Sequence, residues 1–243
     1  QQTILQQKQE LETLNLGKDK VMSIIGHELK GNLFFIYSAV EQIGQLLEKE
    51  DTQSARQMLA NVQKATIHTN EIIENLSRWT AVKRGRIELN KSSLKPSHVL
   101  KKVVEECQLP AEKKGIQLEL ITPDSEPSVL ADPNALRVIF LNLVRNAIKF
   151  TDQGGQVKVK IGWEGSQPTI QVQDNGVGME PELVHELFEK PLHESRVGTA
   201  GEIGTGLGLS ITKELLRGHE ARVEVKSKPG KGSLFTVYWP QEN

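Results

Sequence analysis

The chain has 243 residues, enough for two domains with a hydrophobic core. Its 30 Lys and Arg residues nearly balance its 31 Asp and Glu residues, so no overall charge favours nucleic acid or an anionic membrane. The single cysteine, Cys107, excludes an internal disulfide framework and fits a reducing compartment. No apolar run approaches the ~20 residues that cross a bilayer. The chain opens in mid-helix without an initiator methionine, which indicates a fragment of a longer protein.

Residues from about 4 to 50 predict one long helix, because they lack proline and contain few glycines. Residues 1–20 are expected to form a coiled-coil lead-in. From residue 25 onward, apolar or small side chains recur at alternating spacings of four and three, which predicts a stripe that packs on another helix. This stripe comprises Ile25, Leu29, Asn32, Ile36, Ala39, Ile43 and Leu46. His27 lies off the stripe on a mostly polar face, beside Glu28.

A second helix is predicted after residues 50–52, and either Asp51 or Thr52 is expected to cap it. Its seam comprises Met58, Val62, Ala65, Thr69, Ile72, Leu76 and Trp79. Two helices joined by a short turn form an antiparallel hairpin that cannot hide its apolar seam alone. We therefore assign residues 21–86 to a hairpin that dimerises into a four-helix bundle.

Residues 87–243 predict a second domain in which strands and helices are mixed. Strands are expected over residues 87–94, 116–121, 157–163, 170–172, 222–226 and 233–239. Helices are expected from Ser97 towards Cys107, after the pair Asp132 and Pro133, and over residues 207–216. This pattern indicates an α+β sandwich with a mixed, largely antiparallel sheet and helices on one sheet face.

Three polar motifs follow in order within this domain. Asn142 and Asn146 lie four residues apart on a predicted helix, and Lys149 follows. Amide oxygens suit Mg²⁺, and an ammonium suits phosphate. Asp174 ends an apolar strand, where a carboxylate can accept a hydrogen bond from an exocyclic amine such as that of adenine.

Two glycine-rich stretches complete the set. Gly176 and Gly178 would let the backbone approach the base. Residues 204–209 lead straight into a helix, whose free N–H groups can hold phosphate. Each motif alone has a common structural explanation, such as a surface amide or a tight turn. Together, in this order, they indicate one pocket for adenine, metal and phosphate.

The chain resembles the catalytic core of a two-component sensor histidine kinase. The residues that carry the resemblance are GHELKGNL, LNLVRNAIKF, DNGVGM, GTGLGL and the LFEKP stretch at residues 187–191. The resemblance implies a Bergerat-type ATP-binding domain over residues 87–243. It implies that Asn146 binds Mg²⁺ with support from Asn142, that Lys149 faces the phosphates, and that Asp174 holds the adenine amine. The remaining nucleotide contacts that it implies are Gly176, Gly178, Gly204, Gly206, Leu207 and Gly208.

The same resemblance implies an ATP-dependent autokinase. His27 would attack the γ-phosphate, with Glu28 as its base. The phosphoryl group would then pass to an aspartate of a response-regulator receiver domain. We therefore expect a homodimeric, cytoplasmic enzyme, attached to a membrane only through segments outside this sequence, with no nucleic-acid partner. Residues 198–204 are expected to form a flexible lid over the nucleotide.

The chain departs from the family pattern after the histidine, where Gly31 and Asn32 replace the usual threonine or asparagine followed by proline. This departure puts phosphatase activity towards the receiver in doubt. The sequence leaves two alternatives to the kinase. One is a dimeric scaffold that binds ATP without transferring phosphate. The other is an ATPase of the related chaperone, gyrase and mismatch-repair superfamily, which the N-terminal hairpin disfavours because those enzymes lack it.

Overall fold

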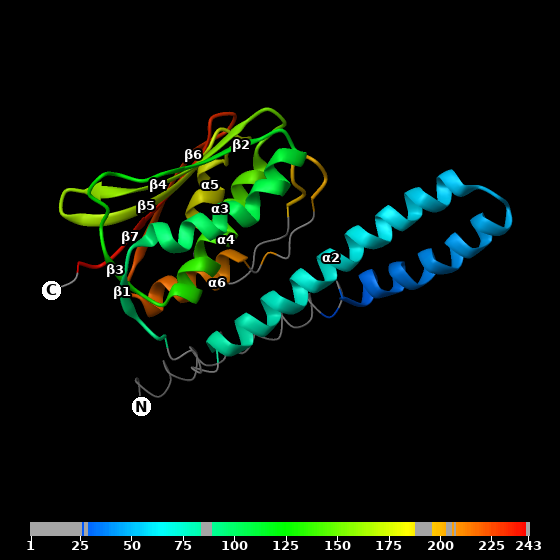
Figure 1. The fold of residues 1–243 in the computed structure, drawn as a ribbon, viewed down its shortest axis with the longest axis horizontal. Coiled ribbons are helices and arrows are strands. Elements are labelled where there is room, and N and C mark those ends of the chain that lie inside the picture. Colours follow the sequence, from blue (N-terminus) through cyan, green and yellow to red (C-terminus); the bar gives the residue numbers. More distant parts are fainter. Residues whose placement is uncertain are drawn as a thin grey trace. The chain divides into compact units, whose positions relative to one another are not determined.

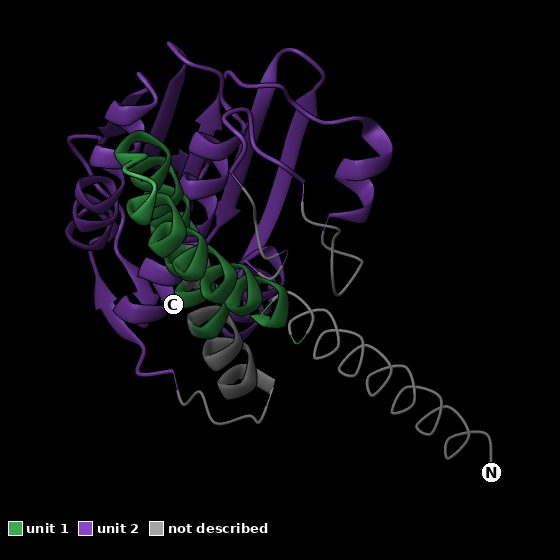
Figure 2. Cartoon of the chain, turned by 90° about the vertical axis from the view of Figure 1, so that its right-hand side faces the viewer, with its two compact units in different colours: residues 1–79 green, residues 80–243 purple. Residues whose placement is uncertain are grey.

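The structure is a computed structural model. It describes Gly26, residues 29–83, 89–187 and 196–202, Gly206, and residues 208–241. The chain divides into two compact units, residues 1–79 and residues 80–243 (Figure 2). The predicted lead-in over residues 1–20 lies outside the described residues. Within the described part, no helix is long and apolar enough to cross a membrane.

The first unit contains two long helices joined by a tight turn. Residues 29–48 form the first helix, and α2 (Thr52–Lys83) is the second. At the turn, Glu50 adopts a left-handed backbone with φ of 58°. The Asp51 N–H then reaches back to the Leu46 carbonyl at 2.9 Å, a common way to end a helix.

Asp51, rather than Thr52, is the residue whose side chain caps α2. Its carboxylate accepts a hydrogen bond from the Ser54 N–H at 3.0 Å. Hydrogen bonds from the backbone and side chain of Ser54 lower the pKa of Asp51. The interruption predicted over residues 50–52 is therefore confirmed, and the capping residue is identified.

Both predicted apolar stripes face the interior of the hairpin. Ala39, Ala55 and Ile72 are buried, and so is Thr69, whose hydroxyl donates to the Ala65 carbonyl at 2.8 Å. Half-buried positions on the two stripes are Leu29, Asn32, Ile36, Ile43, Leu46, Met58, Val62 and Ala65. Ile25 and the side chains of Leu76 and Trp79 lie outside the described residues.

The second unit is built on a five-stranded sheet in the order β2-β4-β5-β7-β6. Strand β2 (Gln117–Ile121) runs parallel to β4 (Gln156–Glu164). The other neighbouring strands run antiparallel, and they are β5 (Gln167–Asp174), β7 (Gly232–Tyr238) and β6 (Arg222–Lys228). A separate antiparallel pair joins β1 (Ser92–Leu94) to β3 (Val129–Ala131).

Three helices cover one face of this sheet (Figure 1). They are α3 (Pro96–Lys113), α4 (Pro133–Phe150) and α6 (Gly208–Gly218), and a short helix, α5 (Pro181–Glu186), follows β5. On β4, Val157, Val159 and Ile161 are buried, while Lys160 between them is exposed. This period of two is typical of a sheet with one buried face. The predicted α+β class is confirmed.

Several element ends differ from the prediction. Ser97 does not cap α3, because the helix already begins at Pro96. Instead, the Ser97 N–H and hydroxyl donate to the Glu126 carboxylate at 2.6 and 2.8 Å. Of the strand predicted over residues 87–94, the structure describes residues 89–94, and only Ser92–Leu94 form a strand, β1. Neither β3 nor α5 was predicted.

Helix α4 begins at Pro133 as predicted, and the residue that caps it is Asp132. Its Oδ1 accepts hydrogen bonds from the N–H groups of Asn134 and Ala135 at 2.8 and 2.9 Å. Its own N–H donates to Nε2 of the buried His219 at 3.1 Å. The other ring nitrogen, Nδ1, lies 2.7 Å from the Leu215 carbonyl and must donate to it. The His219 ring is therefore held neutral between the start of α4 and the end of α6.

This buried histidine predicts acid sensitivity of the fold. Burial lowers the pKa of His219, although the Leu215 carbonyl opposes this effect. As the pH falls below the unfolded value of ~6.5, the unfolded chain binds a proton that the folded chain does not. We therefore expect the free energy of unfolding to decrease as pH falls from about 6.5 towards the lowered pKa, by up to about 1.4 kcal/mol per pH unit.

Urea unfolding across this pH window measures the effect. His219→Gln should flatten the pH dependence, since an amide does not titrate there. His98→Gln, at an exposed histidine on α3, should keep the wild-type dependence. An unchanged slope in His219→Gln would contradict the prediction.

Candidate functional site

A buried carboxylate stands at the end of the central strand β5. Asp174 is 6% exposed. Its Oδ1 accepts hydrogen bonds from the Gly176 N–H at 2.9 Å and from the Ser233 N–H at 3.2 Å. Since both bonds from the described part of the chain fall on Oδ1, Oδ2 is left for a donor on a ligand. Burial raises the pKa of Asp174, and the two N–H groups partly offset that rise.

The turn after Asp174 is pressed against backbone on two sides. A Cβ at Gly176 would lie 2.1 Å from the Phe150 carbonyl oxygen, which accepts a hydrogen bond from the Val177 N–H at 3.0 Å. Gly178 has φ of +66°, and a Cβ there would lie 2.0 Å from the Lys228 carbonyl oxygen. These glycines are therefore required by the approach of the protein's own backbone, an explanation different from the predicted approach to a base.

Helix α4 carries the asparagine and lysine side chains of the first predicted motif. The Asn142 amide donates to the Gly208 carbonyl at 3.1 Å and lies 3.5 Å from the Thr212 hydroxyl. Asn142 therefore ties α4 to the first turn of α6. Asn146, one turn further along α4, is half-buried. The Lys149 ammonium lies 5.0 Å from the centre of the Phe150 ring.

Helix α4 thus contacts both glycine motifs within the second unit. Its C-terminal end meets Val177 in the first motif, and Asn142 meets Gly208 in the second. Gly206 has φ of +67°, a conformation that favours glycine. Of the predicted site residues, His27, Glu28, Gly204 and Leu207 lie outside the described residues, and their predicted roles remain predictions.

The predicted Mg²⁺ site can be compared with the metal ligands that the protein offers. The described part of the chain contains no group of three His, Cys, Asp or Glu side chains that could hold a metal ion. Asn146 offers an amide oxygen. Mg²⁺ commonly binds through one or two protein ligands together with substrate phosphates and water. The residues therefore fit a magnesium ion that takes most of its ligands from a nucleotide.

Two polar partners in this region were not predicted. The Ser233 N–H comes from β7 and reaches Asp174 across 59 residues of sequence. The Thr212 hydroxyl meets Asn142 across 70 residues. Both contacts depend on tertiary pairing, so no local pattern in the sequence could indicate them.

Comparison with known proteins agrees with this architecture. Residues 131–243 match the family model described as "Histidine kinase-, DNA gyrase B-, and HSP90-like ATPase". The chain is 30% identical over 239 residues to the sensor histidine kinase YclK of Bacillus subtilis, and 27% identical over 228 residues to the adaptive-response sensory kinase SasA of Crocosphaera subtropica. These alignments cover 97% and 92% of this chain. Residues 131–243 thus belong to this ATPase family, and nearly the whole chain is similar to sensor histidine kinases.

The chain spans 49% of the length of YclK and 59% of SasA. Its fold is also similar to the histidine kinase AdeS of Acinetobacter baumannii, with a TM-score of 0.67 and 18% identity, covering 89% of this chain and 98% of that one. The crystal structure of full-length ShkA in complex with AMPPNP has a TM-score of 0.63 and 25% identity, covering 82% of this chain and 45% of that one.

Proposed function

We propose that this chain is an ATP-dependent kinase that phosphorylates its own His27. Asp174 is the observation that carries the nucleotide half of the proposal. A buried carboxylate with one oxygen satisfied by two backbone N–H groups and the other left for a ligand matches the exocyclic amine of adenine. The complex of the similar kinase ShkA with AMPPNP supports an adenine nucleotide as the ligand.

In this proposal the phosphates lie towards α4 and the start of α6. Lys149 faces them, and the glycine stretch at residues 204–208 contributes backbone N–H groups. Asn146 is the protein ligand for Mg²⁺, and Asn142 supports the arrangement by holding α6 against α4. When bound, Mg²⁺ would neutralise phosphate charge.

The chemical step is proposed for the N-terminal unit. A neutral ring nitrogen of His27 attacks the γ-phosphorus and forms a nitrogen–phosphorus bond. The bond from that phosphorus to the bridging oxygen breaks, and ADP leaves. Glu28 takes the proton from the other ring nitrogen. The labile phosphoryl group then passes to an aspartate of a receiver domain. Because Gly31 has no side chain, we expect only weak phosphatase activity towards that receiver domain.

Transfer of the labelled γ-phosphate of ATP to the chain tests this proposal. A product that is labile in acid and stable in base identifies a phosphohistidine. The two alternatives give different results. A scaffold would bind ATP without acquiring label, whereas a gyrase-like ATPase would release phosphate without retaining any on the protein. A panel of receiver domains would then identify the partner.

We further propose that the hairpin dimerises into a four-helix bundle. Besides the inward-facing stripes, the hairpin presents a second set of large apolar side chains that are exposed in the single chain. They are Leu33, Phe34, Phe35, Tyr37, Val40, Leu47, Leu59, Ile67 and Ile73. So many exposed large apolar side chains on one hairpin are typical of an interaction site, and a second copy of the hairpin matches them.

A charge on this second surface should separate the subunits. Val40 is 58% exposed in the single chain, so Val40→Glu should leave the hairpin intact but bury an unpaired charge in a dimer. Such a charge costs about 3–5 kcal/mol, which weakens association by at least about 100-fold. Light scattering should show a wild-type dimer and a Val40→Glu monomer at micromolar concentration. Gln42→Glu, at a nearby exposed position, should stay dimeric. A wild-type monomer would refute the proposal.

A further inference from the structure

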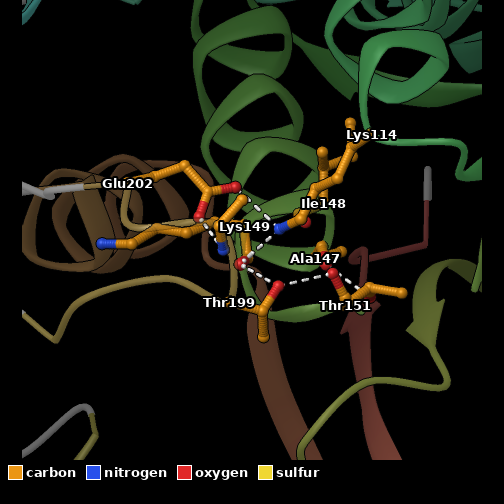
Figure 3. Close-up of polar contacts among 8 residues, drawn as sticks. Lys114, Ala147, Ile148, Lys149, Thr151, Thr199 and Glu202 are labelled. Carbon is orange, nitrogen blue, oxygen red and sulfur yellow. Dashed lines mark hydrogen bonds and ion pairs between the residues drawn. The ribbon is translucent and has the colours of Figure 1, made fainter. Parts of the chain in front are cut away.

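The C-terminal end of α4 is satisfied by groups from two distant parts of the chain, the end of α3 and the loop at residues 198–202 (Figure 3). The last carbonyls of a helix have no partner within it and carry partial negative charge. Here the Lys114 ammonium, whose side chain is only 10% exposed, donates to the carbonyls of Ile148 and Lys149 at 2.8 and 2.9 Å. Its third contact is with the Glu202 carboxylate at 2.7 Å.

Glu202 belongs to a compact loop at residues 198–202. The Gly198 N–H donates to the Glu202 carbonyl at 2.8 Å, and the Ala200 N–H donates to the Glu202 carboxylate at 2.8 Å. Burial raises the pKa of Glu202, but hydrogen bonds from Lys114 and from backbone N–H groups outweigh it, so this pKa is lowered overall. The ion pair with Lys114 is therefore maintained at neutral pH.

The same loop binds the end of α4 through Thr199. The Thr199 N–H donates to the Lys149 carbonyl at 3.0 Å, and its hydroxyl donates to the Thr151 carbonyl at 2.8 Å. The Lys149 carbonyl thus accepts hydrogen bonds from both Lys114 and Thr199. Residues 198–202, which were predicted to belong to a flexible lid, are held on α4 by this set of contacts.

The loop also confines the side chain of Lys149. A Cβ at Gly198 would lie 2.6 Å from Cγ of Lys149 and 2.8 Å from its carbonyl oxygen. The aliphatic part of Lys149 therefore runs directly against the Gly198 backbone. Movement of the loop would remove this wall from beside the Lys149 side chain.

We propose that Lys114 and Glu202 are positioning residues in the binding of a nucleoside triphosphate. Their ion pair holds residues 198–202 on α4 and thereby directs Lys149 towards the phosphates. This inference rests on the proposed nucleotide-binding function. Neither residue needs to contact the nucleotide. Lys114 holds the backbone carbonyl of Lys149, and Glu202 holds the loop whose Gly198 backbone lies against the Lys149 side chain.

Glu202→Gln tests the inference with little risk to folding, because Glu202 is 35% exposed and the amide keeps its size. We expect affinity for AMPPNP to fall about tenfold, because misplacing Lys149 should cost about one hydrogen bond between its ammonium and a phosphate. Affinity for adenosine should stay within about twofold, since adenosine has no phosphate for Lys149 to contact. Hydrogen exchange of the Thr199 amide should be faster in the nucleotide-free variant. Glu119→Gln, at an exposed site on β2, should match the wild type in all three measurements.

Equal losses for adenosine and AMPPNP, or no loss for either, would overturn the inference, and so would unchanged exchange at Thr199. These results are distinct from a failure of the proposed function. If the wild-type chain binds neither adenosine nor AMPPNP, the nucleotide site itself is wrong, and this inference falls with it. If the wild type binds both and Glu202→Gln binds both equally well, only the positioning role is wrong.

Discussion

Asp174→Asn should weaken ATP binding about 100-fold while leaving the domain folded. The asparagine oxygen can replace Oδ1 and accept the same two hydrogen bonds from Gly176 and Ser233. The amide nitrogen then takes the place of Oδ2 and presents a donor to the adenine amine, which is itself a donor. The variant therefore loses recognition without losing its internal hydrogen bonds. Titration calorimetry with ATP measures the loss, and a urea unfolding curve checks the fold.

The nature of the base provides a sharper version of this test. Inosine triphosphate has an acceptor where ATP has an amine, so the new amide should favour it relative to the wild-type carboxylate. We expect the ratio of ATP affinity to inosine triphosphate affinity to fall in Asp174→Asn. Asp152→Asn, an exposed neighbour of the site, serves as the matched control and should keep the wild-type ratio. Undiminished ATP affinity in Asp174→Asn would show that the base lies elsewhere.

The parts of the fold that follow from short-range physics could be predicted from the sequence. The spacing of four and three in the hairpin stripes depends only on helix geometry, and Ala39 and Ile72 are buried as expected. The capping of α4 by Asp132 involves residues at most three positions away. These features involve neighbours along the chain, so a single sequence contains the information.

Features that depend on tertiary contacts could not be predicted in the same way. Ser97 has the chemistry of a helix cap, but the Glu126 carboxylate takes that role from 29 residues away. Gly176 and Gly178 were predicted to allow the backbone to approach a base, whereas the close approach in the structure is to a carbonyl from another element. A local pattern can show that a side chain is excluded without showing what excludes it.

The loop at residues 198–202 shows the same limit within the candidate site. Its glycines and small residues predict flexibility, and nothing nearby in the sequence indicates a partner. Lys114 lies 88 residues before Glu202, at the end of α3, where a lysine is ordinarily a solvated charge. Only the packing of α3 beside α4 brings this ammonium to the last carbonyls of α4 and to Glu202.

His27→Ala should abolish incorporation of labelled phosphate while leaving ATP affinity within about twofold of the wild type. The change removes the nucleophile, and no other group on that face of the helix is expected to form a phosphohistidine. The predicted acceptor belongs to residues 1–79, whereas Asp174, Asn146 and Lys149 belong to residues 80–243. Because acceptor and nucleotide residues fall in different compact units, the loss of one should not disturb the other.

His98→Ala is the matched control for this variant. His98 is an exposed histidine on α3, and its removal should leave both labelling and ATP affinity at the wild-type level. The two readouts separate the possible errors. Acid-labile, base-stable phosphate recovered on His27→Ala would assign the acceptor to another histidine. Equal loss of labelling and of ATP binding would instead show that His27 supports the fold, because removal of a nucleophile alone cannot weaken nucleotide binding.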